Sequence, residues 1–391
     1  MLLSHLPVEI LHSIASFLPR SSIAQLCLAN RHVYAKCLPV LYACLELSFR
    51  SHIEYIVNDQ HSFLRHVLEN HTRHLHLVCR QSGSHAMIAS LAHWLPNIHT
   101  LTFSDYHVLP ADQLCDLLQL FPNIRTLQFR FCHLQYTGND THGKIKGTLT
   151  SIDNLDLVWT DFSDDAITLL LGNMPNLVRV HFGTNHNRNR FANNNALVAL
   201  EMHCLNIRNL SISLQHVQED VICGVIVSYG HQLTHLSIPC ESPRILAVIA
   251  THALQLEHLI IRAATTREHV THLEVTRRRQ PTAISNTVAA TSGFSHARLG
   301  MIHILQQCQA LVYLEMTSWM VRDIPYEVWQ FFRHQEGTPG MNSSNSYEKY
   351  YYLNDMAWRR RRGLQQHDVG YLTKTLALHT RELYEIRKRL R

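Results

Sequence analysis

Histidine is the residue type in this sequence best suited to chemistry, because the chain has 30 of them among 391 residues. A neutral imidazole binds metal ions and transfers protons near neutral pH. The closest groups are His71, His74 and His76, then His252 and His258, then His269 and His272. None is backed by a cysteine, aspartate or glutamate at a spacing typical of metal ligands, and HExxH does not occur. The sequence therefore predicts structural or surface histidines and no metal site.

Other patterns that would indicate an enzyme are absent from the sequence. The 10 cysteines stand singly without a CxxC pair, which is typical of small apolar core residues in a reducing compartment. Neither a glycine-rich phosphate loop nor a GxSxG motif occurs. We therefore expect a non-catalytic protein without a cofactor, although a fold could still assemble an active site from distant residues.

Charge and hydropathy narrow the possible partners. The formal net charge is +5, which is modest for this length and makes nucleic acid an unlikely partner. No apolar run is long enough to cross a membrane. The N-terminal segment lacks a basic region and carries Glu9, so it does not resemble a signal peptide. We expect an intracellular protein of the cytoplasm or nucleus, with no membrane contact.

One nine-residue pattern recurs along the chain. It reads LPNIHTLTF at 95–103, FPNIRTLQF at 121–129 and MPNLVRVHF at 174–182. The spacing is about 26 residues or twice that, a period typical of a repeated supersecondary unit. A looser apolar pattern, φxxφxφ, extends the series to nine copies. Their central residues are Leu75, Leu101, Leu127, Leu155, Val180, Leu210, Leu236, Leu259 and Leu314.

Each copy predicts a strand, a turn and a helix. The last three residues of the pattern alternate, as in a strand with one buried face. The stretches between copies have helical spacing, with Ser163 as an expected N-cap and Pro110 before another helix start. A single strand–helix pair cannot bury its apolar face, so the units are expected to stack on one another.

The repeated pattern resembles the leucine-rich repeat LxxLxLxxN/C in its longer form, with a helix on the convex side. Cys132 and Asn185 occupy the final slot, and Thr160 is a tolerable substitute. Other residue types stand there in the remaining copies, which weakens the regular hydrogen-bonded ladder. The resemblance implies an α/β solenoid shaped as a horseshoe; an irregular α/β domain is the alternative.

A short helical segment precedes the repeats. It reads LPVEILHSIASFLPRSSIAQLCLANRHVYAKCLPVLY and predicts three helices. The first would start near Pro7 and end at Pro19, the second would be capped by Ser21 or Ser22, and the third would run from about Arg31 to Leu41. Three helices of this length cannot bury a sufficient core. Their surplus apolar surface must dock on the repeats or on another protein.

This segment resembles an F-box over roughly residues 3–45. The matching residues are Leu6-Pro7-x-Glu9-Ile10-Leu11, Ile14, Leu18, Pro19-x-Ser21-Ser22-Ile23, Leu26 and Asn30-Arg31. Two positions depart from the family pattern, where Ala15 replaces a bulky apolar residue and Val33 a tryptophan. The family docks on a Skp-family adaptor that links to a cullin–RING ubiquitin ligase. The resemblance implies adaptor contacts through Leu6, Pro7, Glu9, Ile10, Leu11, Ile14 and Leu18.

The side chains on either side of each central leucine are expected to share the inner, concave face of the sheet. We call this set the inner lane. It comprises His74, His76, Thr100, Thr102, Thr126, Gln128, Asn154, Asp156, Arg179, His181, Asn209, Ser211, His235, Ser237, His258, Ile260, Tyr313 and Glu315. Recognition of a phosphorylated target would need clustered arginines, and Arg179 is the only one in this set.

Three domains are predicted: an F-box over 1–48, a solenoid of about nine irregular repeats over 49–334, and a linker with a basic C-terminal helix over 335–391. Two interruptions, 183–195 and 263–297, are expected to be loops, with a degenerate repeat around Val270-Leu273-Val275 as the alternative for the second. The apolar residues of the C-terminal segment step by three and four from Val369 through Leu376 and His379 to Leu390. This helix could close the end of the repeats or pair with a partner helix.

These features favour a substrate-binding subunit of a Skp–cullin–F-box ubiquitin ligase that performs no chemistry itself. An unknown target protein would bind the repeats. The alternative is a leucine-rich-repeat scaffold whose N-terminal helices only cap the solenoid. A third possibility is a nucleic-acid or anionic-membrane binder that uses the arginine run at 359–362.

Overall fold

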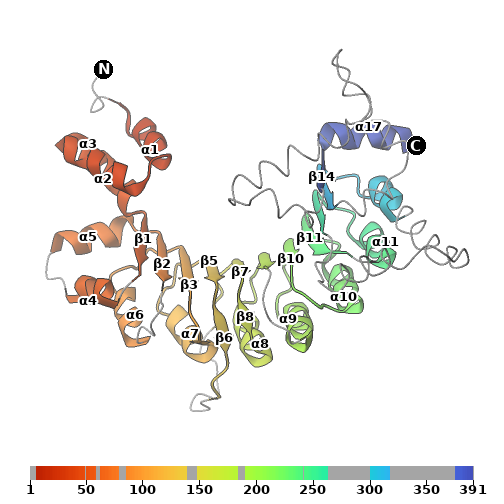
Figure 1. The fold of residues 1–391 in the computed structure, drawn as a ribbon, viewed down its shortest axis with the longest axis horizontal. Helices are drawn as coiled ribbons and strands as arrows, with labels where there is room; N and C mark the ends of the chain where they lie inside the picture. Colours follow the sequence, from red (N-terminus) through yellow and green to blue (C-terminus); the bar gives the residue numbers. More distant parts are fainter. Residues whose placement is uncertain are drawn as a thin grey trace, which may run out of the picture. The chain divides into compact units, whose positions relative to one another are not determined.

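A computed structural model of the chain describes residues 6–48, 50–58, 62–78, 85–138, 148–183, 190–240, 242–262, 300–317 and 375–390 (Figure 1). The chain forms two compact units. The first unit comprises Met1–Asn187 with Met202–Leu205, and the second comprises Arg188–Glu201 with Asn206–Arg391. Within the described ranges, no helix is long and apolar enough to span a membrane.

Three helices open the first unit: α1 (Val8–Ser16), α2 (Arg20–Ala29) and α3 (Arg31–Tyr42). They surround a small core of Ala15, Ile23, Cys27, Val33 and Cys37. The third helix contacts α5 (Ser62–His71) and β1 (Cys44–Leu47), which joins the three helices to the rest of the unit.

The ends of these helices differ in part from the prediction. Asn30 caps α3, because its side chain accepts a hydrogen bond from the His32 N–H at 2.8 Å. The prediction that Ser21 or Ser22 caps α2 is wrong. The extended backbone of Pro19 precedes the helix, so that α2 already begins at Arg20 and both serines lie inside it.

The rest of the first unit repeats strand and helix. Its main sheet is parallel, in the order β1, β2 (His74–Val78), β3 (Thr100–Ser104), β5 (Thr126–Arg130), β7 (Asn154–Val158) and β9 (Arg179–Phe182). A smaller parallel sheet joins β4 (Leu109–Pro110), β6 (His133–Gln135) and β8 (Asp161–Phe162). The helices are α4 (Arg50–Asn58), α5, α6 (His85–Ala92), α7 (Ala111–Leu118) and α8 (Asp164–Gly172). Figure 1 shows α6, α7 and α8 on one side of the main sheet.

Successive repeats lie in register, which confirms the predicted strand cores. Leu75 is opposite Leu101, Leu101 opposite Leu127, and Leu127 opposite Leu155. All nine central residues of the pattern are at most 2% exposed. The starts of two helices also agree with prediction, since α7 follows Pro110 and the Ser163 side chain caps α8 by accepting from the Ala166 N–H. The unit is a stack of strand–helix repeats around a parallel sheet, consistent with the predicted α/β solenoid.

The recurring Pro-Asn pair has a structural role. Asn97 Nδ2 donates to the Glu69 carbonyl, Asn123 Nδ2 to the Pro96 carbonyl, and Asn176 Nδ2 to the Thr150 carbonyl, each at 2.9 Å. Each bond reaches back to the preceding repeat. A ladder of side-chain hydrogen bonds thus joins adjacent units, and this explains why the nine-residue motif recurs with asparagine at the same place.

The second unit continues the pattern. It contains most of α9 (Arg190–His203), then β10 (Asn209–Ile212), α10 (Glu219–Tyr229), β11 (His235–Pro239), α11 (Pro243–His252), β12 (His258–Arg262), a helical segment at 300–307, β13 (Tyr313–Thr317), β14 (Thr375–His379) and α17 (Thr380–Leu390). Strands β10 to β13 are parallel, and β14 pairs antiparallel with β13. The predicted loop at 183–195 is wrong in part, because α9 already begins at Arg190.

The C-terminal segment corrects the prediction of one long helix. Residues 375–379 form β14, where Leu378 lies opposite Leu314, and the helix α17 starts only at Thr380. Leu383 and Ile386 of α17 are buried. Pairing with β13 and burial of these side chains favour the interpretation that the segment closes the sheet of this unit. Residues 263–299 and 318–374, with the predicted loop, the linker and the arginine run, lie outside the described residues.

Candidate functional site

Helix α1 has two apolar faces with different surroundings. Leu11 and Ala15 are fully buried within the chain. Ile10, Ile14 and Leu18 are 49%, 39% and 37% exposed, and Phe17 is 87% exposed. The exposed residues follow helical spacing, so they form one strip, which we call the α1 stripe: Ile10, Ile14, Phe17 and Leu18. Among the residues that the structure describes, none covers this apolar strip.

The other predicted adaptor-contact residues divide between surface and core. Pro7 and Glu9 are exposed, and Leu6 is half-buried. Leu11 corrects the prediction, because its side chain has no surface to offer a partner. The apolar pattern of this segment in the sequence does not separate the two faces of the helix. Phe17 and Leu28, both 87% exposed, extend the apolar surface beyond the predicted set.

In the first unit, the inner lane is already engaged in hydrogen bonds between strands. His76 Nε2 lies 2.8 Å from Ser104 Oγ, and its Nδ1 lies 3.6 Å from a Glu46 carboxylate oxygen. The Thr102 hydroxyl donates to Gln128 Oε1 at 3.0 Å. These bonds connect β1, β2, β3 and β5 across the face of the sheet. A molecule that binds here would contact polar side chains that these hydrogen bonds already hold in place.

Ion pairs extend this network on β7 and β9. His181 Nδ1 lies 2.7 Å from Asp156 Oδ1, and Arg179 pairs with Asp153 at 3.1 Å. The one arginine of the inner lane is thus already paired with a carboxylate. This pairing supports the expectation that the lane is not built for phosphate recognition. The remaining predicted members in this unit lie at successive register positions of the same sheet: His74, Thr100, Thr126 and Asn154.

The inner lane of the second unit has a different character, because rings contact one another across its strands, and the His235 and His258 rings are stacked. His235 lies opposite His258, His258 opposite Tyr313, and Tyr313 opposite His379. The ring centroids of these pairs are 4.3, 5.7 and 5.2 Å apart. Asn209 continues the row on β10, opposite His235. His379 was not among the predicted site residues, because the sequence did not indicate that β14 joins the sheet.

Two members of this row, His235 and Tyr313, have pKa values shifted by their surroundings. Burial and the neighbouring His258 lower the pKa of His235, while Glu257 acts in the opposite direction. The Tyr313 hydroxyl donates to Glu315 Oε2 at 2.6 Å. Burial, together with this carboxylate, raises the pKa of Tyr313. His235 and Tyr313 are therefore favoured in their uncharged forms at neutral pH.

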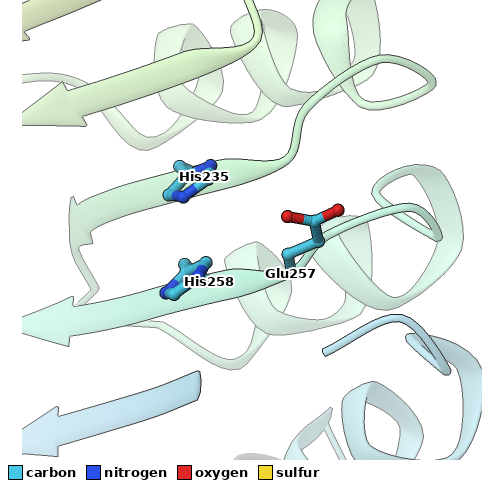
Figure 2. A group of neighbouring side chains, drawn as sticks. All are labelled: His235, Glu257 and His258. Carbon is cyan, nitrogen blue, oxygen red and sulfur yellow. The ribbon is translucent and has the colours of Figure 1, made fainter. Parts of the chain in front are cut away.

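Glu257 brings a carboxylate to the two stacked histidines. Ligand atoms of His235, Glu257 and His258 all lie within 4.8 Å of one another. Figure 2 shows the two rings side by side on β11 and β12, with Glu257 at the start of β12. Sequence analysis missed this group, because His235 lies one repeat away from the other two residues. The signal that could have found it is the parallel register of the repeats.

The cysteines agree with the predicted core role. Eight of the nine described cysteines are buried, and all nine are free thiols. Burial raises the pKa of Cys115 and Cys204 to about 12, and that of Cys132 and Cys308 to about 11. A thiol with such a pKa is protonated at neutral pH and a poor nucleophile. These four residues pack rather than react.

Comparison with known proteins adds little to this geometry. No protein-family model matches the chain, and no curated protein sequence matches it. Among solved structures, the chain is similar to the leucine-rich repeat-containing protein LegL7 from Legionella pneumophila. The similarity covers 72% of this chain and 90% of that chain, with 12% sequence identity and a TM-score of 0.37.

Proposed function

We propose that this chain is the substrate-binding subunit of a Skp–cullin–F-box ubiquitin ligase. In this proposal α1–α3 act as the F-box, the α1 stripe contacts the Skp-family adaptor, and the inner lane of the repeats holds a target protein. The observation that carries the proposal is the α1 stripe, a row of exposed apolar side chains on a helix whose opposite face is fully buried.

The two faces of α1 distinguish this proposal from the scaffold alternative. Helices that only cap a solenoid are expected to bury their apolar residues against the neighbouring repeat. Here the contact with the repeats is made by α3, through α5 and β1. Ile14 and Phe17 remain exposed, as does Leu28 on α2. A docking surface for a second protein accounts for these residues better than a capping role does.

The proposed mechanism is proximity without chemistry by this chain. A receptor that binds a ligase at one end and a target at the other raises the effective concentration of target lysines near the ubiquitin-conjugating enzyme. Rigid strands suit this task, because they hold the inner lane in a fixed orientation. The hydrogen-bonded lane of the first unit and the ring row of the second unit are the surfaces available for a target.

The test is binding of a purified Skp-family adaptor to the full chain, measured by calorimetry. The informative variant is Ile10→Asp with Ile14→Asp, because both residues are exposed and a charge there need not disturb the core. We expect this variant to lose adaptor binding by at least about 100-fold, since two buried charges would remain unpaired in the complex.

Val108→Asp is the matched control, because Val108 is an exposed apolar residue of the repeat region, 53% exposed. We expect it to bind the adaptor like the unaltered chain. Circular dichroism verifies that all three proteins are folded. Equal adaptor affinity of the double variant and the unaltered chain would contradict the proposal, and so would the absence of binding by the unaltered chain.

A further inference from the structure

Two neighbouring repeats bring three potential metal ligands together on the inner lane of the second unit. The parallel register of β11 and β12 sets His235 opposite His258, and Glu257 directly precedes His258. Among the residues that the structure describes, no other three histidine, cysteine, aspartate or glutamate side chains come as close. The proximity results from the backbone register and therefore does not depend on a chance surface contact.

We propose that His235, Glu257 and His258 bind one divalent transition-metal ion, with Zn²⁺ as the representative ion. Two imidazoles and one carboxylate form a donor set suited to Zn²⁺ with a fourth position left open. Imidazole also suits copper and nickel, whereas Ca²⁺ and Mg²⁺ require mainly oxygen ligands. The donor set therefore selects for transition metals against the abundant alkaline-earth ions.

The hydrogen bonds of His235 prepare one of its nitrogens for a metal. His235 Nδ1 lies 2.9 Å from Thr234 Oγ1, and that hydroxyl lies 3.3 Å from Asn209 Oδ1 and 3.4 Å from the Arg208 carbonyl oxygen. The hydroxyl has one proton, and both of these oxygens can only accept it. When the hydroxyl donates to one of these oxygens, Thr234 Oγ1 accepts from the Nδ1–H of His235, and the lone pair of the ring then lies on Nε2. Metal-binding histidines have this arrangement, in which the second nitrogen donates to a fixed acceptor.

Metal binding requires a small rearrangement of the rings. The two imidazoles are nearly parallel, with an interplanar angle of 8°. A nitrogen lone pair lies in the plane of its ring, so parallel rings do not aim at a shared ion. With Zn–N distances of about 2.0–2.1 Å, tetrahedral ligand atoms lie about 3.4 Å apart, which is within reach of a group spanning at most 4.8 Å. Because Thr234 holds His235, we expect the half-buried His258 ring to turn out of the stack.

Two of the three proposed ligands, His235 and His258, belong to the inner lane, the surface assigned above to a target. The metal site does not depend on that assignment. Water or a donor atom of any bound molecule would complete the coordination. The ion would also add positive charge to this face of the sheet.

The test measures Zn²⁺ binding by the full chain, without an affinity tag, in competition with a chromophoric chelator. We expect the unaltered chain to hold one tight Zn²⁺ equivalent that His235→Asn with His258→Asn abolishes. Glu257→Gln should weaken it by at least about 10-fold, because a direct ligand matters at least as much as an outer-shell partner. Substitution of Co²⁺ should give visible absorption bands typical of nitrogen and oxygen ligands in the unaltered chain but not in the double variant.

His231→Asn is the matched control, because His231 is an exposed histidine of the same unit. It should retain the tight Zn²⁺ equivalent, which separates the site from weak binding by the other histidines. Circular dichroism establishes that each variant is folded. The proposal is overturned if the double variant and His231→Asn bind the same number of tight Zn²⁺ ions, or if Ca²⁺ displaces Zn²⁺ from the unaltered chain at equal concentration.

Discussion

At the scale of single residues, the asparagine of the Pro-Asn pair does the same work in three repeats. Asn97, Asn123 and Asn176 each donate to a backbone carbonyl of the repeat before their own. Leucines in the core provide apolar area, but they slide past one another at little cost. A directional bond to the neighbouring repeat adds a constraint on the stacking register.

Replacement of Asn123 by alanine tests this role. The variant loses the bond from Asn123 Nδ2 to the Pro96 carbonyl. We expect the free energy of unfolding to fall by about 1 kcal/mol, the typical net value of such a bond. Urea denaturation followed by circular dichroism measures the change. Gln119→Ala, at an exposed residue just before the same motif, should change it by less than about 0.5 kcal/mol. Equal effects of both substitutions would contradict the ladder.

Residue types alone predicted part of the candidate site. The alternation around each central leucine placed His235, His258 and Tyr313 on one face, and the structure sets them at matching positions of adjacent strands. Glu257 joins the two histidines because it lies just before the first residue of β12. The alternation of side chains along a strand does not predict where a residue before the strand will place its carboxylate. Leu11 was misassigned for a related reason, because the side on which helices pack decides which of two apolar faces is exposed.

At the scale of elements, periodicity identified strands well where the same pattern recurs and poorly at the C-terminus. Leu376 and His379 fit a helical step of three and four, yet they lie in β14. A short apolar stretch fits the period of a helix as well as that of a strand. Pairing with the edge strand β13 makes this stretch a strand. Sequence patterns carry no information on such long-range pairing. The caps show the same limit, since Ser163 has the predicted role whereas Ser21 and Ser22 do not.

Arg387 anchors the last helix to the element that precedes β13. Its guanidinium donates to the carbonyl oxygens of Leu305, Cys308 and Leu311 at 3.1, 2.6 and 3.2 Å. These carbonyls lie at and beyond the end of the helical segment at 300–307, where no further backbone donor follows in the helix. A side chain that satisfies three carbonyls at once stabilises both elements.

Arg387→Met keeps much of the apolar length of the side chain and removes its donors. We expect the free energy of unfolding of the second unit to fall by about 2 kcal/mol, because half-buried carbonyls lose a charged partner. Amide hydrogen exchange should become faster in α17 and β14. Arg381→Met, at an exposed position of the same helix, should leave both measurements close to those of the unaltered chain. Faster exchange in both variants alike would argue against an anchoring role.

At the scale of the whole molecule, repeats in register make stability a local property. Each repeat contacts mainly its neighbours, so the chain resembles a row of linked units rather than one core. The small core of α1–α3 is separate from the column of leucines in the sheet. The period in the sequence was sufficient to predict this architecture, because every repeat contains the same apolar pattern. The division into two compact units was not predicted, since no single residue type marks it.

Leu127→Ala tests how far a local defect spreads. Leu127 is fully buried between Leu101 and Leu155, and its truncation should cost about 2–5 kcal/mol. Hydrogen exchange followed by mass spectrometry should show the largest loss of protection in β3, β5 and β7, because these strands share the resulting cavity. Peptides from α1–α3 should keep their protection, since their core does not include Leu127.

Leu259→Ala, at the equivalent fully buried position between Leu236 and Leu314, should instead affect β11, β12 and β13. If either substitution lowers protection equally in every described element, the chain unfolds as one cooperative block and the row of semi-independent repeats is the wrong description.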